Sequence, residues 1–96
     1  MTTYLVQHTG KNFLIDDGKK QTFRNFRSSR LVEAENIDRA EEIALEKLSA
    51  HLSAKISIIN EESDPPVVLV EKVNEVSAVA YDAQNRAFSI YWEPED

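Results

Sequence analysis

Hydrophobic residues recur with two different periods along the chain, and these periods predict strands and one helix. Apolar runs at residues 4–8 (YLVQH) and 12–16 (NFLID) predict strands, with Thr9-Gly10 between them as either a turn or a bulge. The Asp-Gly dipeptide at 17–18 predicts a two-residue hairpin turn, in which both central residues have positive φ. In residues 30–36 (RLVEAEN) apolar and acidic positions alternate, as in a half-buried strand.

A helical period follows and predicts a helix from about residue 37 to residue 53. Asn36 is a favourable N-cap, and Asp38 with Glu41 offers a second capping box one turn later. We expect one face of this helix to pack on the sheet against Val32 and Ala34 and the opposite face to be solvated. The packing face comprises Ile37, Ala40, Ala44, Leu48 and His51, and the solvated face comprises Asp38, Glu42, Glu46, Ser49 and Ser53.

After the helix the sequence returns to strand-like patterns. The two prolines of residues 60–66 (NEESDPP) predict a loop, because proline lacks an amide donor. The β-branched run from residue 67, extending as far as residue 76, and the segment 87–92 (AFSIYW) predict two further strands, before an acidic tail at 93–96. The alternation in AFSIYW places Trp92 in the core with Phe88 and Ile90.

This order of strands, helix and strands predicts an α+β fold, with an antiparallel sheet of four to five strands and one long helix packed on one face. The 96 residues are expected to form one domain, 1–96. The chain contains no cysteine, which excludes disulfides and thiolate metal sites. No apolar stretch is long enough to span a bilayer and no signal peptide is recognisable, so we expect a cytoplasmic protein without membrane contacts.

Motifs for catalysis and cofactor binding are missing from the sequence. Gly10 and Gly18 are the only glycines and neither precedes the helix, so no phosphate-binding loop is predicted. His8 and His51 lack a second ligand at the spacing of zinc sites, and packing roles are favoured for both. We therefore expect no enzyme, cofactor or metal site. A small enzyme using His8 or His51 with surface carboxylates is the least favoured alternative.

The formal net charge of -6 conceals a basic segment. Residues 11–30 carry six Lys/Arg and two Asp, whereas residues 31–96 carry five Lys/Arg and fifteen Asp/Glu. Within it, TFRNFRSSR (22–30) leaves no room for a stable helix and is expected to be an extended, solvated edge with interleaved arginines and phenylalanines. A second interpretation is that its arginines contact an acidic protein partner or the chain's own acidic tail. The candidate partner-binding residues are Lys19, Lys20, Phe23, Arg24, Phe26, Arg27 and Arg30.

These features favour a small non-enzymatic protein-interaction domain. A sheet with a single helix leaves an edge and an apolar face for partners, so we expect a homodimer or an adaptor. The alternative is a nucleic-acid-binding module that uses the basic aromatic stretch 19–30, with Phe23 and Phe26 stacking on bases. The overall acidity of the chain weighs against nucleic acid.

Overall fold

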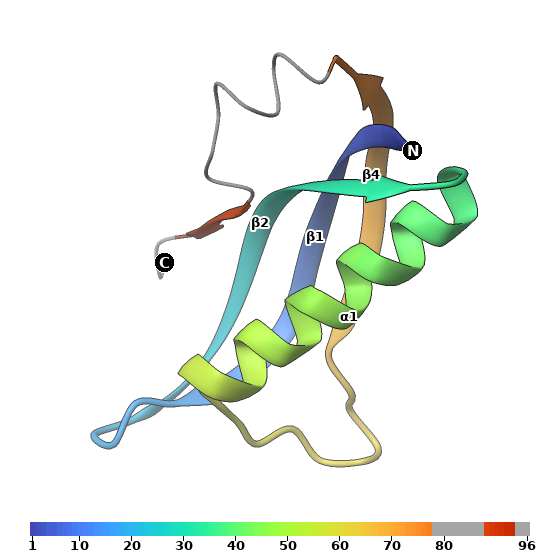
Figure 1. The fold of residues 1–96 in the computed structure, drawn as a ribbon. Coiled ribbons are helices and arrows are strands. Elements are labelled where there is room, and N and C mark those ends of the chain that lie inside the picture. Colours follow the sequence, from blue (N-terminus) through green and yellow to red (C-terminus); the bar gives the residue numbers. More distant parts are fainter. Residues whose placement is uncertain (78–87, 94–96) are drawn as a thin grey trace.

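A long hairpin of β1 (Thr2–Asp16) and β2 (Gln21–Ala34) forms the centre of an antiparallel sheet in the computed structural model, which describes residues 1–77 and 88–93 (Figure 1). On the other side of β1 lie β4 (Val67–Val76) and, near the hairpin end, the two-residue β3 (Ser57–Ile58). The strand β5 (Phe88–Trp92) pairs with β2. The α+β prediction is confirmed, although β3 was not expected.

The hairpin predicted at Asp17-Gly18 is present, but its connection differs from the prediction. Four residues, 17–20, join the strands instead of two, and Gly18 has a positive φ of 91° while Asp17 does not. The Asp17 carboxylate accepts hydrogen bonds from the amides of Lys20 and Lys19, both at 2.9 Å, and these bonds lower the pKa of Asp17. The aspartate side chain closes the loop, so a second residue with positive φ is not required.

The expected break near Thr9-Gly10 is a bulge within one continuous strand. The pairing of β1 with β2 shifts between Gly10, which is opposite Phe26, and Phe13, which is opposite Arg24. Asn12 absorbs the irregularity with a φ of 62°, and its side-chain amide donates to Asp64 Oδ1 at 2.8 Å. The bulge brings Phe13 into the core, where its side chain is buried.

The helix α1 (Ile37–Lys55) begins at the predicted cap, since Asn36 Oδ1 accepts from the Arg39 amide at 2.9 Å. It ends two residues later than expected, and its buried residues are Ala40, Ala44, Leu48 and Leu52. Ile37 was expected to pack on the sheet but is 52% exposed. The buried residues are spaced by four, and this spacing extends back to Asn36 and not to Ile37, which lies about 60° around the axis from Ala40.

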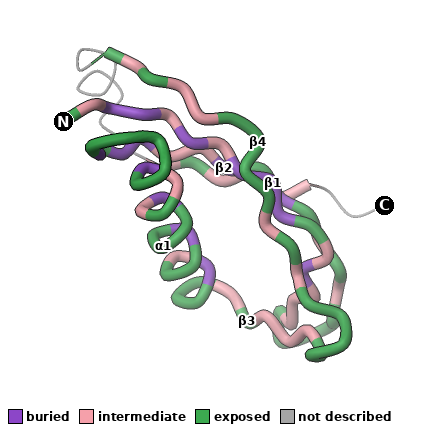
Figure 2. Tube along the Cα trace, turned by 90° about the vertical axis from the view of Figure 1, so that its right-hand side faces the viewer, coloured by how far each residue is buried: buried purple, intermediate pink, exposed green. Residues whose placement is uncertain are grey.

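Two apolar clusters join the helix to one face of the sheet. Figure 2 shows buried segments on α1 and on β1 and β2. In the first, Ala40 and Ala44 pack with Val32 and Ala34 as predicted, together with Tyr4 and Val6. In the second, Leu48 and Leu52 pack with Phe13 and Phe26, against which Phe88, Ile90 and Trp92 lie partly buried. Trp92 lies on the predicted face and packs against the core with Phe88 and Ile90, although it is only partly buried, and Tyr91 on the opposite face is exposed.

Within the described part of the chain, the helix covers one face of the sheet and the other face is open (Figure 1). The loop predicted at 60–66 contains no helix or strand. Residues 94–96 of the predicted acidic tail and Ala87 of the predicted last strand lie outside the described residues. Within the described ranges, no helix is long and apolar enough to cross a membrane.

Candidate interaction surface on the open face and edge of the sheet

Residues 26–30 of the basic stretch lie in the centre of the sheet, so for them the prediction of a solvated edge is wrong. Residues 22–25 pair with no described strand other than β1. β2 is paired with β1 on one side and with β5 on the other. Phe26 is completely buried, with its ring centroid 5.2 Å from that of Phe13 and 5.0 Å from that of Trp92. A buried ring cannot stack on a base.

The arginines of this stretch point to different surroundings. The Arg30 guanidinium lies 4.1 Å from the centroid of the Phe88 ring, and burial lowers the pKa of Arg30. Arg24 donates to the backbone carbonyl of Glu93 at 2.9 Å. Arg27 is exposed on the open face, with its Nε 3.9 Å from the Glu93 carboxylate. Such an exposed pair contributes at most about 1 kcal/mol.

The remaining candidates lie elsewhere. Lys19 and Lys20 belong to the hairpin loop, and Phe23, on β2, is 54% exposed. The structure thus distributes the seven predicted residues over the core, the open face and the hairpin end. It does not gather them into one basic patch.

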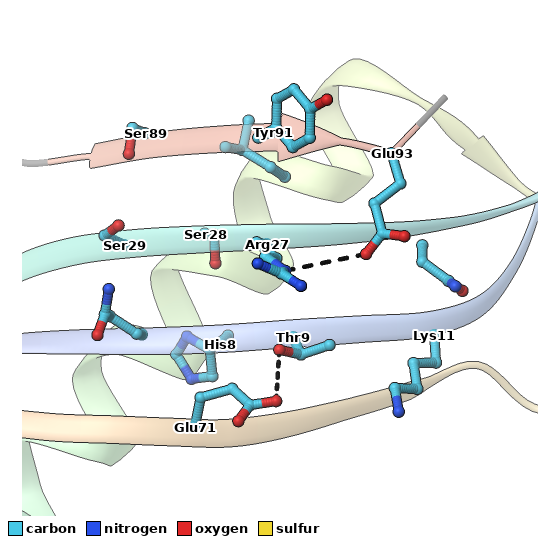
Figure 3. Close-up of a pocket in the computed structure, with 13 residues that line it drawn as sticks. His8, Thr9, Lys11, Arg27, Ser28, Ser29, Glu71, Ser89, Tyr91 and Glu93 are labelled. Atoms are coloured by element: carbon cyan, nitrogen blue, oxygen red, sulfur yellow. Dashed lines mark hydrogen bonds and ion pairs between the residues drawn. The ribbon is translucent and has the colours of Figure 1, made fainter. Parts of the chain in front are cut away.

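A shallow hollow of about 760 Å³ occupies the open face of the sheet, where side chains from β1, β2, β4 and β5 meet (Figure 3). Thr9 Oγ1 donates to Glu71 Oε1 at 2.6 Å across one side of the hollow, and Arg27 faces Glu93 across the other. Lys11 is a second cationic residue in the lining. Two cationic and two anionic side chains balance, so the hollow has no strong preference for a charged ligand.

The two histidines occupy packing positions. His8 is 2% exposed, its Nε2 has no hydrogen-bond partner, and burial, with a smaller contribution from Arg30, lowers its pKa. His51 is half-buried, with its ring 4.7 Å from that of Phe88. In residues 1–77 and 88–93, neither imidazole is hydrogen-bonded to a carboxylate, and no cluster of three potential metal ligands occurs. The enzymatic alternative therefore receives no support from the geometry of either histidine.

Among the described residues, the outer edge of β4 carries three exposed large hydrophobic side chains. Among the described strands, β4 pairs only with β1. Val67, Leu69 and Val70 are 43%, 45% and 45% exposed. The sequence pattern did not reveal this exposure, because the continuous run VVLV is also typical of a strand that is buried on both faces.

A second bulge interrupts β4. Lys72 is opposite Gln7 and Val70 is opposite His8, which leaves Glu71 as an extra residue without a partner on β1. Since residues opposite one another point to the same face, Leu69 and Lys72 point to the open face and Val70 to the helix face. The Glu71 carboxylate also reaches the open face, where it meets Thr9 (Figure 3).

Comparison with known protein families, curated proteins and solved structures gave no match to this chain.

Proposed function

We propose that this protein is a small non-enzymatic protein-interaction domain that binds its partners through the β4 edge. The observation that supports this proposal is the combination of a ten-residue edge that no other described strand pairs with and three exposed aliphatic side chains, Val67, Leu69 and Val70. An edge strand offers a row of backbone donors and acceptors to an added strand, and the side chains around it supply apolar contact area.

The β4 edge is a better binding surface than the open-face hollow. Burying the exposed half of a Val or Leu side chain contributes about 1 kcal/mol. The hollow offers one exposed ion pair, between Arg27 and Glu93, and such pairs contribute little. The bulge at Glu71 twists the edge, which favours a partner with a matching twist over indiscriminate strand addition.

Leu69→Lys tests this proposal, because it places a charge at the centre of the apolar edge. Leu45→Lys is the matched control, since Leu45 is 44% exposed, almost the same as Leu69, but lies on α1. Both variants are compared with the wild type by sedimentation velocity over a hundredfold concentration range and by affinity capture from a cell lysate. Thermal unfolding checks that each variant is folded.

We expect self-association or a captured protein with the wild type and with Leu45→Lys, and its loss with Leu69→Lys. If no protein binds, or if binding is the same for all three chains, the proposal is wrong.

A further inference from the structure

We infer that the β4 edge pairs with the β4 edge of a second copy of this chain, antiparallel, with Glu71 opposite the partner's Lys72. This inference rests on the proposed function and specifies its partner and register. Twofold symmetry makes the contact twice, so that Lys72 also lies opposite the partner's Glu71. The two sheets then form one continuous sheet.

The bulge restricts the register of this pairing. Residues opposite one another in an antiparallel pair must point to the same face. Before the bulge the even-numbered Val68 and Val70 share the helix face with their partners Gly10 and His8, whereas after the bulge the odd-numbered Val73 does so with Val6. An even-numbered residue before the bulge must therefore face an odd-numbered residue after it.

A slip by one residue in one direction places Glu71 opposite the partner's Glu71 and Val70 opposite the partner's Lys72, and a slip in the other direction places Lys72 opposite the partner's Lys72. Either register opposes like charges and joins residues that point to different faces. A slip by two residues places either Val70 opposite the partner's Glu71 or Lys72 opposite the partner's Val73, which again mixes the faces. The register with Glu71 opposite the partner's Lys72 matches the faces along the whole of Val67–Val76.

The same register gives apolar partners to exposed aliphatic residues. Val70 lies opposite the partner's Val73 on the helix face, and Val67 lies opposite the partner's Val76 on the open face. Leu69 faces the partner's Asn74 and lies diagonally next to the partner's Val76 and the partner's Lys72 on the open face. Leu69→Lys therefore loses an apolar contact and approaches a like charge, whereas Val68, opposite the partner's Glu75, contributes less. Each pair is made twice, which gives four valine pairs around a centre of two opposite-charge pairs.

The central charges are complementary on the open face. Glu71 and Lys72 are both exposed, and Thr9 holds the Glu71 carboxylate by one of its oxygens, which leaves the other oxygen to accept from the partner's Lys72. The charge pattern of the edge is therefore complementary to itself when the second copy runs antiparallel.

Charge reversal tests the contact between Glu71 and the partner's Lys72. Glu71→Lys and Lys72→Glu each place like charges opposite one another at both symmetric positions, so we expect dimerisation to weaken by about tenfold at low salt. The double variant Glu71→Lys/Lys72→Glu restores opposite charges and should dimerise within about threefold of the wild type. Thr9→Val is the control, because it removes the hydrogen bond to Glu71 without changing a charge.

Spin labels measure the register directly and do not depend on the charges. The chain has no cysteine, so Val67→Cys and Val76→Cys each provide one labelling position per copy. In the inferred register the two labels of either variant are separated by nine residue steps, or about 30 Å along the strands. A slip by two residues would shorten one distance and lengthen the other, so that they differ by about 13 Å.

Equal label distances together with recovery in the double variant support the inference. Self-association that Leu69→Lys abolishes, but with unequal distances or without recovery, overturns the register and leaves the proposed function intact. A monomer that captures a different protein through Leu69 overturns the second copy as partner and also leaves the proposed function intact. Absence of any binding that depends on Leu69 overturns both.

Discussion

The ring of Phe26 lies against the backbone of Gly10, its partner across the β1–β2 hairpin. A Cβ atom built on Gly10 would be 2.0 Å from Cε2 of Phe26, which is far inside van der Waals contact. Glycine is required at this position for close approach rather than for a turn. The absent side chain creates the space that a completely buried phenylalanine fills at the centre of the sheet.

Gly10→Ala should destabilise the fold by about 1 to 3 kcal/mol, because the added methyl group forces Phe26 out of its packing with Phe13 and Trp92. Urea unfolding measures this loss. Gly18→Ala is the comparison, since no atom lies within 4 Å of the position that its Cβ would occupy. Only the positive φ of 91° disfavours alanine there, and it should lower the free energy of unfolding by about 1 kcal/mol. A Gly10→Ala protein as stable as the wild type would show that Phe26 does not depend on this space.

Leu48→Ala should reduce the free energy of unfolding by about 2 to 5 kcal/mol, because Leu48 is 1% exposed beneath α1. Leu45→Ala removes the same atoms from a side chain that is 44% exposed on the same helix, and its effect should be much smaller. Thermal and urea unfolding of the two variants give the comparison. An unchanged midpoint for Leu48→Ala would remove this helix face from the core.

The sequence predicted the elements well where the local pattern is decisive. Asn36 caps the helix because its side chain bonds to an amide three residues away, and such local chemistry is visible in the sequence. Ile37 was assigned to the wrong face because, at 100° per residue, more than one set of apolar residues can be grouped on one side of the helix. The choice between Ile37 and Leu52 depends on where the helix crosses the sheet, which is a property of the tertiary packing.

The candidate site was less predictable, because it depends on which strands are neighbours. Arg24, Phe26 and Arg27 are close in sequence, but the position of β2 between β1 and β5 sends them to different surroundings. The exposed β4 edge also follows from strand order, since the same VVLV run in a central strand would be buried. No local signal distinguishes these two cases.

Oligonucleotide binding should be absent at micromolar concentrations and physiological salt, because the basic residues of 19–30 do not share a face and Phe26 is buried. Fluorescence anisotropy with single-stranded and duplex oligonucleotides at low and physiological salt provides the measurement. Lys19→Glu/Lys20→Glu/Arg27→Glu is the appropriate variant, since these three residues are exposed and their reversal leaves the core intact. Salt-sensitive binding that this variant abolishes would restore the nucleic-acid interpretation.

The buried His8 should make the stability of the fold fall as the pH decreases below about 6.5. Burial lowers the pKa of His8 in the folded state from its ordinary value of 6.5, so between that folded pKa and 6.5 the unfolded chain binds more protons than the folded chain. The free energy of unfolding therefore rises with pH in this window: the contribution of His8 is complete above 6.5 and is lost as the pH falls through the folded pKa.

Urea unfolding between pH 7.5 and 5.5, at one protein concentration, measures the slope in a range where the lowered pKa of Asp17 does not contribute. His8→Gln should flatten this slope whatever its effect on absolute stability, whereas His51→Gln, at a half-buried ring beside Phe88, should retain it. A wild-type protein whose stability is constant or increases from pH 7.5 to 5.5 would contradict a neutral, desolvated imidazole at position 8.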